Sequence, residues 1–188
     1  DVDQEFIDSL LESGICYVPT LTREVSTYIY GTRPGFFDDE FFTEYANESE
    51  IERLSEPAYM ERTLASASGA AYRVALVQAM ENMVILQDAG APVTFGTDAG
   101  PAGRFPGYFE HMELALMVGG GLTPTQALLA ATSVAASCLG IDDIGTLEPG
   151  KWADFIVLDE DPTRDITYTQ LIDQVYVAGQ PVRTKTEN

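Results

Sequence analysis

Apolar residues recur in two different patterns along the first part of the chain. Residues 4–13 carry them at helical spacing, and Gly14 is a natural place for a helix to end. Residues 15–18 form a short apolar run that Pro19 ends, which predicts a buried strand. A helix that leads directly into a buried strand is one repeat of an α/β fold.

Helical spacing returns three times further along. It predicts helices over residues 58–89, over residues 109–118 and from Thr123 to about Leu139. Thr123 suits the N-cap of the last helix, because a proline follows it at the first helical position. Residues 91–95 form an apolar run with β-branched and aromatic side chains, which predicts a second buried strand. The predicted fold class is therefore α/β.

After Gly150 the pattern changes to a period of two. It predicts strands over residues 154–158 and 175–177, a tight turn at Gly179 and a return strand that starts at Val182. The C-terminal part of the chain is therefore expected to form a small β unit of its own.

Residues 20–56 fit neither pattern and are rich in aromatic and acidic side chains. A loop this long inside a compact domain is usually functional or contains short helices. Because it follows the end of a predicted strand, it could cover an active-site mouth as a lid or a substrate wall. It could equally be an insertion that packs on a neighbouring subunit, and the sequence leaves both alternatives open.

The composition of the chain limits which binding partners and which cellular compartment we expect. The 188 residues include 30 acidic and 10 basic side chains, for a net charge of −20, which disfavours binding to nucleic acid or to an anionic membrane. No apolar run approaches the ~18 residues of a membrane-spanning helix. Without a basic or apolar leader in this part of the chain, we expect a cytoplasmic protein. Cys16 and Cys138 lack metal-ligand spacing, and we interpret them as reduced core thiols.

Candidate chemistry centres on Asp98, in the stretch Ala-Pro-Val-Thr-Phe-Gly-Thr-Asp-Ala-Gly over residues 91–100. The chain turns at Gly96, so the carboxylate lies where the predicted strand ends, and parallel α/β folds place their chemistry at that end. A carboxylate there can bind a metal or accept a proton from water. On the local pattern alone, an aspartate that caps the next turn is an equal alternative.

Two further motifs favour the catalytic interpretation of Asp98. Residues 121–132 read Gly-Leu-Thr-Pro-Thr-Gln-Ala-Leu-Leu-Ala-Ala-Thr, and residues 145–159 read Gly-Thr-Leu-Glu-Pro-Gly-Lys-Trp-Ala-Asp-Phe-Ile-Val-Leu-Asp. Together with the Gly-Thr-Asp-Ala-Gly turn, they resemble the amidohydrolase superfamily of metal-dependent hydrolases. The similarity is greatest to the branch of imidazolonepropionase-like enzymes and Xaa-Pro or Xaa-Arg dipeptidases. It is weakest over residues 23–56.

The resemblance implies the C-terminal part of a (β/α)8 TIM barrel over residues 1–145, with the insertion at about 20–56. Residues 146–188 would complete a small β-sandwich domain. In this superfamily the aspartate at the position of Asp98 binds a divalent metal, most often zinc, with one or two ions per site, and is catalytic. The metal-binding histidines precede that aspartate, whereas the single histidine of this chain, His111, follows it.

The chain is therefore interpreted as a C-terminal fragment whose partner is the missing N-terminal part of the barrel. The implied substrate is a small amide or a dipeptide. Because two barrel strands alone leave sheet edges uncovered, self-association into a homo-oligomer is also expected. The alternatives are a catalytically inactive fragment that serves only as a structural or association module, and a standalone α/β binding domain.

Four other residues are candidates for the substrate side of the site. His111 could face the substrate or be a structural histidine, and Arg104 could meet a substrate carboxylate or be a solvated loop residue. Tyr17 and Thr20, at the end of the first predicted strand, would point toward the same mouth. Glu113 could orient the loop after Asp98.

Overall fold

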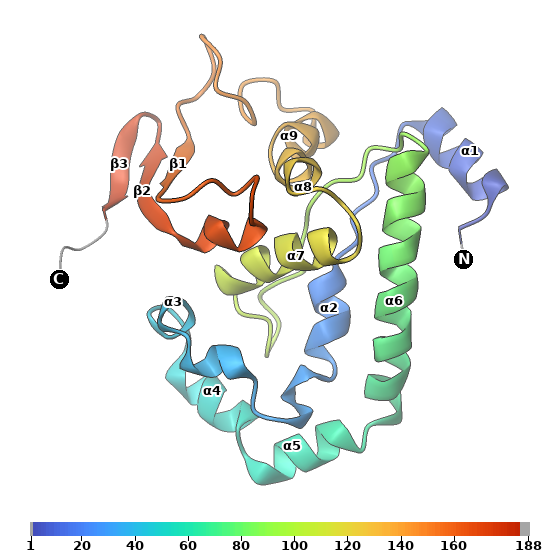
Figure 1. Cartoon of the computed structure of the whole chain (residues 1–188), viewed down its shortest axis with the longest axis vertical. Coiled ribbons are helices and arrows are strands. Elements are labelled where there is room, and N and C mark those ends of the chain that lie inside the picture. The colour runs from blue at the N-terminus through green and yellow to red at the C-terminus, as the bar shows by residue number, and fades with distance from the viewer. Residues whose placement is uncertain (1, 185–188) are drawn as a thin grey trace.

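The computed structural model describes residues 2–184 and shows a mostly helical molecule with one small sheet (Figure 1). The α-helices are α1 (Gln4–Ser13), α2 (Leu21–Ser26), α3 (Glu40–Thr43), α4 (Glu48–Leu54), α5 (Pro57–Leu64), α6 (Ala67–Asp88), α7 (Tyr108–Gly119), α8 (Pro124–Ala130) and α9 (Ser133–Leu139). The 3-10 helices are η1 (Ile29–Gly31), η2 (Gly35–Asp38) and η3 (Ile166–Gln170). The strands are β1 (Phe155–Leu158), β2 (Ile172–Val177) and β3 (Gln180–Thr184).

The strands predicted near the C-terminal end are confirmed. Its three strands are antiparallel in the order β1-β2-β3, and Gly179 lies in the turn between the last two. Phe155 and Tyr176 are paired across β1 and β2, with their rings stacked at 4.4 Å between centroids. Figure 1 shows this sheet at one side of the molecule, away from α1 and α6.

The two predicted buried strands are much shorter than expected. They meet in a single parallel bridge between Tyr17 and Val93, where the amide of Tyr17 donates to Pro92 O at 3.0 Å and that of Thr94 donates to Tyr17 O at 2.8 Å. Ile15 is 61% exposed, whereas Val93 is 2% exposed. A parallel strand needs neighbours on both edges, and residues 2–184 supply one neighbour. The predicted barrel is therefore not seen in the described part of the chain.

Helix prediction succeeded where the ends carry clear signals. α1 ends at Gly14, whose φ of 64° is the left-handed conformation that glycine tolerates best, and α7 covers the predicted helix at 109–118. Two long predicted helices are each broken. Ser66 caps a new helix by accepting from the amide of Gly69, which separates α5 from α6. Thr132, with φ −127° and ψ −95°, separates α8 from α9.

The core has two parts. The larger one packs α1, α6, α7 and α8 around Val93. The smaller one is aromatic and brings residues of the insertion onto Phe105 and Phe109 after Asp98; its buried members are Tyr30, Phe37, Phe42, Leu54, Phe105 and Phe109. The insertion at 20–56 is thus helical rather than irregular, and it lies against the loop that follows Asp98.

The structure corrects the prediction of two free thiols, because Cys16 and Cys138 form a disulfide bond. The two cysteines are 122 positions apart in the sequence, so their spacing gave no sign that α9 lies against the segment after α1. Within residues 2–184 no helix is both long enough and apolar enough to cross a membrane.

We expect reduction of this disulfide to destabilise the protein. Closing a loop of 122 positions restricts the unfolded chain, and the chain-entropy account puts the effect at ~5 kcal/mol in the free energy of unfolding. Urea denaturation with and without a reductant measures it. A variant with both Cys16→Ser and Cys138→Ser is the control, since it should unfold at one urea concentration under both conditions. Equal stability of the unsubstituted protein in both conditions would contradict a structural role for the bond.

Candidate functional site

The site is built where the segment of Val93 ends. Gly96 is required there for close packing, because a Cβ at this position would lie 2.7 Å from Cγ1 of Val18. Two residues later, Asp98 has a φ of 51°, in the left-handed region where asparagine and aspartate are the commonest residues after glycine. Its side chain is 54% exposed. The turn thus presents a carboxylate to solvent at the end of the segment that pairs with Tyr17.

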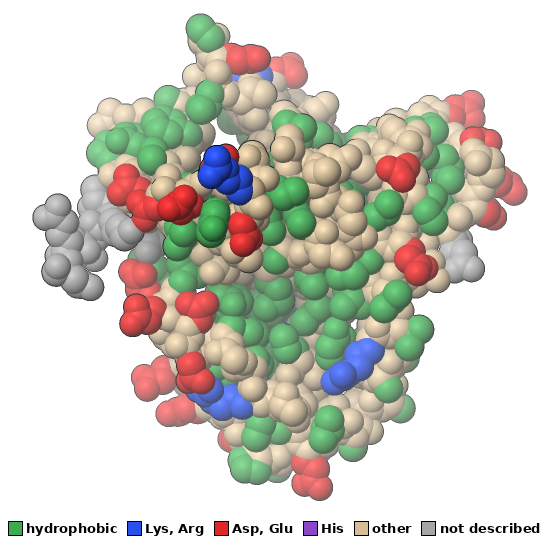
Figure 2. Space-filling model, in the orientation of Figure 1, with side chains coloured by type: hydrophobic (Ala, Val, Ile, Leu, Met, Phe, Trp, Pro, Cys, Tyr) green, Lys and Arg blue, Asp and Glu red, His purple; other side chains and the backbone are tan. Residues whose placement is uncertain are grey.

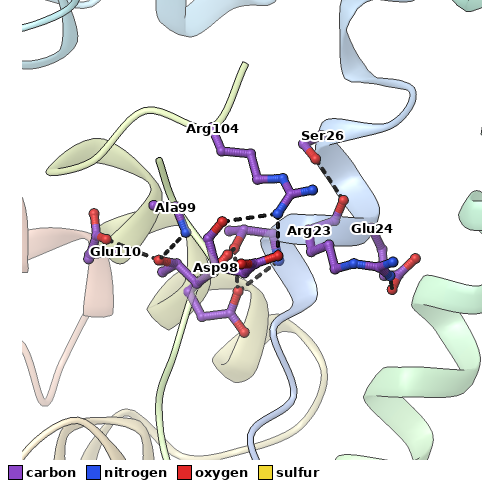
Figure 3. Close-up of polar contacts among 10 residues, drawn as sticks. Arg23, Glu24, Ser26, Asp98, Ala99, Arg104 and Glu110 are labelled. Atoms are coloured by element: carbon purple, nitrogen blue, oxygen red, sulfur yellow. Dashed lines mark hydrogen bonds and ion pairs between the residues drawn. The ribbon is translucent and has the colours of Figure 1, made fainter. Parts of the chain in front are cut away.

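Arg104 is the partner of Asp98 (Figure 3). Its Nη1 donates to the backbone oxygen of Asp98 at 3.0 Å and also to the carboxylate. The loop between them is closed by backbone hydrogen bonds from Gly100 to Arg104 and from Arg104 to Pro101. The Arg104 side chain is 18% exposed, so Arg104 reaches Asp98 from within the loop. The structure therefore brings together two of the predicted site residues.

A second carboxylate, Glu110, accepts hydrogen bonds from residues on both sides of this loop. Its Oε1 accepts from the hydroxyl of Thr97 at 3.0 Å, and its Oε2 accepts from the amide of Gly107 at 2.6 Å. The hydroxyl oxygen of Thr97 in turn accepts from the amide of Ala99 at 3.1 Å. Along the chain, Asp98 therefore lies between Thr97 and Gly107, which are both hydrogen-bonded to Glu110 in the first turn of α7.

Glu113, one turn further along α7, is fully buried. Its carboxylate accepts from the amides of Leu21 and Thr22 and from the hydroxyl of Thr22, each at 2.7 Å. Burial raises the pKa of Glu113, and the hydrogen bonds from Thr22 and Leu21 oppose that rise. Glu113 was expected to orient the loop after Asp98. It instead binds the amides at the start of α2, and Glu110 holds the Asp98 loop.

Two other predicted site residues, Tyr17 and Thr20, lie outside the hydrogen bonds of Glu110 and Glu113. Tyr17 is in the parallel bridge, and burial, aided by the charge of Glu113, raises the pKa of its hydroxyl. Thr20 occupies the N-cap position of α2 with a φ of 48° and makes no side-chain capping bond. Within the described residues, neither side chain is hydrogen-bonded to Asp98 or Arg104.

His111 points to another part of the structure. Its Nδ1 is 2.9 Å from the hydroxyl of Thr169 in η3, and the ring of Phe41 meets it edge to face at 4.9 Å. Burial lowers the pKa of His111, although the charge of Glu110 acts in the opposite direction. The structure does not bring His111 into contact with Asp98.

The described side chains around Asp98 include few metal-ligand types. Between residues 2 and 184 no three side chains of histidine, cysteine, aspartate or glutamate come together in a way that could hold a metal ion. A zinc site needs three or four such ligands. The described residues by themselves therefore do not fit the metal that the superfamily resemblance implies, and Asp98 is the one ligand candidate that they contribute.

The comparisons with known proteins define the class. Residues 8–182 match the Amidohydrolase family, and the chain therefore belongs to that family of metal-dependent hydrolases. The imidazolonepropionase of Deinococcus deserti is 48% identical over 85 residues, which are 45% of this chain and 21% of that protein. The chain thus spans about a fifth of the length of this curated relative.

Solved structures match over almost the whole chain. A Xaa-Pro dipeptidase with bound methionine is 28% identical, with a TM-score of 0.61, over 96% of this chain and 37% of the other. A putative prolidase from Bifidobacterium longum is 26% identical, with a TM-score of 0.60, over 100% of this chain and 41% of the other. The chain is therefore similar to the C-terminal portion of these proteins.

We expect Glu113→Gln to destabilise the protein by ~2–4 kcal/mol. The amide that replaces one carboxylate oxygen is itself a donor, so at least one buried donor of Thr22 or Leu21 loses its acceptor. Chemical denaturation measures the loss. Glu81→Gln makes the same change of charge at an exposed position of α6 and should stay within ~0.5 kcal/mol. Equal stability of the two variants would show that the Glu113 network is dispensable.

Proposed function

We propose that this chain is the C-terminal portion of a metal-dependent amidohydrolase that hydrolyses a C–N bond in an amide, a cyclic amide or a dipeptide. The observation that carries the proposal is the half-exposed carboxylate of Asp98, held in a left-handed turn at the end of the Val93 segment. The turn is fixed on both sides by Glu110 and by Arg104, so the carboxylate is presented in one orientation.

The chemistry available to Asp98 is that of a general base. A carboxylate can accept a proton from the water that attacks the carbonyl carbon and then deliver it to the leaving nitrogen as the C–N bond breaks. Arg104 orients the carboxylate before substrate arrives, because its guanidinium contacts both the side chain and the backbone oxygen of Asp98.

The divalent metal of the family, with zinc as the first candidate, would supply Lewis-acid activation of the carbonyl and the water. Asp98 would be one of its ligands. The other ligands would have to come from parts of the protein beyond the described residues, since these hold no cluster of three candidate ligands. The missing part of the barrel is therefore the partner that this function requires.

The decisive experiment is Asp98→Asn in the whole protein. The asparagine keeps the shape but cannot accept the proton, so we expect turnover to fall by ~10²–10⁴-fold. Formation of new carboxylate and amino groups from a panel of dipeptides, cyclic amides and simple amides is the readout. Asp88→Asn, at the exposed end of α6, is the matched control and should retain full turnover. Near-normal turnover of the Asp98 variant would mean that the carboxylate only caps its loop.

A second substitution separates two roles of Arg104. Because the guanidinium contacts Asp98, we expect Arg104→Gln to lower kcat for substrates with and without a free carboxylate by a similar factor, about tenfold. If Arg104 instead held a substrate carboxylate, KM would rise for carboxylate-bearing substrates alone. Steady-state kinetics on one matched pair, a dipeptide and its C-terminal amide, distinguishes the two outcomes.

A further inference from the structure

An apolar pocket of about 410 Å³ lies beside the first turn of α7, and it reaches Ile172 at the start of β2. Five aromatic residues and one histidine make most of its wall: Phe41, Phe42, Tyr45, Phe105, Tyr108 and His111. Its volume lies within the range of small-molecule sites, which are mostly apolar with a few polar groups.

This pocket is on a different face of α7 from the site around Asp98. Glu110 and Glu113 are directed toward Thr97 and Thr22. One residue along a helix turns the side chain by about 100°, so His111 is directed toward η3 instead, where it meets Thr169. Asp98 and its partner in the loop do not line the pocket.

The hydrogen bonds of Thr169 determine which nitrogen of His111 carries the proton. The hydroxyl of Thr169 donates to Ile166 O at 2.8 Å, so it can only accept from the imidazole. Nδ1 of His111 therefore carries the proton, and Nε2 of the neutral ring is an acceptor. Burial favours the neutral ring by lowering its pKa. No described residue donates to Nε2.

Negative charge disfavours the binding of an anion in this pocket. The chain has a net charge of −20, and Figure 2 shows acidic side chains gathered around the margins of one face of the molecule, while hydrophobic side chains fill its hollowed centre. Tyr108 lies near Asp39, and burial together with that charge raises the pKa of its hydroxyl to about 12. Electron-rich ring faces attract the positive edge of another aromatic ring.

We propose that this pocket binds a neutral aromatic molecule that carries an N–H donor, of the indole class, with its donor on Nε2 of His111 and its ring against the aromatic wall. The apolar wall recognises the ring by burial, and the single acceptor recognises the donor. This proposal does not rest on the function assigned to Asp98.

Indole and indene are a matched pair of probes, because they share size and shape and differ in the N–H group. Titration of the whole protein, followed by ligand-observed NMR, should show indole binding about five- to tenfold more tightly than indene, as one net hydrogen bond predicts. Benzoate should not bind. Equal affinity for indole and indene, or no indole binding, would overturn the proposal.

The variant His111→Leu removes the acceptor and keeps an apolar side chain of similar volume. It should lower the affinity for indole to that for indene and leave the affinity for indene unchanged. Glu81→Gln, on an exposed face of α6, should leave both affinities unchanged. Retention of the indole preference in a folded His111→Leu protein would also overturn the proposal. The indole–indene comparison in the unsubstituted protein remains informative if that variant does not fold.

Discussion

The buried carboxylate of Glu113 is the constraint on which the arrangement of the site depends. It joins α7 to the amides of Leu21 and Thr22 at the start of α2, residues that are more than 90 positions away in the sequence. The N-terminal amides of a helix lack backbone partners, so a negative charge placed there satisfies them and meets the positive end of the helix dipole. A buried carboxylate without such donors would be costly. The amides of Leu21 and Thr22 and the carboxylate of Glu113 therefore stabilise each other only when α2 and α7 are both folded.

The consequences of that contact extend to Asp98. The hydroxyl of Thr22 donates its one proton to Glu113 and lies 3.3 Å from Thr97 O, so the start of α2 packs against the turn before Asp98. Because Glu110 is one turn from Glu113, the same helix also holds Thr97 and Gly107. Helix α7 thus positions the residues that follow Tyr17 and those that follow Val93, the two partners of the parallel bridge. Supporting residues of this kind fix a reactive group in place. The left-handed backbone of Asp98 is held within this framework.

Sequence analysis located the elements whose signals are local. The glycine after α1, the Thr-Pro start of α8 and the period-two pattern near the C-terminus all depend on neighbouring residues, and each was found in place. The breaks at Ser66 and Thr132 were missed because the apolar spacing continues through both positions. The disulfide between Cys16 and Cys138 and the burial of Glu113 were not predictable, since each depends on segments brought together by the tertiary fold. Asp98 was predicted as a site residue from its place after an apolar run, but its contact with Arg104 depends on how the loop closes.

Charge adds a last constraint on what the site could accept. An acidic surface of this strength repels anionic ligands at a distance, and Asp98 adds its own charge at the end of the Val93 segment. Arg104 is the cation placed against that carboxylate, and its side chain is mostly covered. A cation that already neutralises Asp98 cannot attract a distant anion as strongly as a free one, because the two opposite charges cancel beyond a few ångströms. The Asp98–Arg104 pair therefore contributes little field of its own beyond a few ångströms, and the acidic surface remains the main electrostatic constraint on charged molecules near this turn.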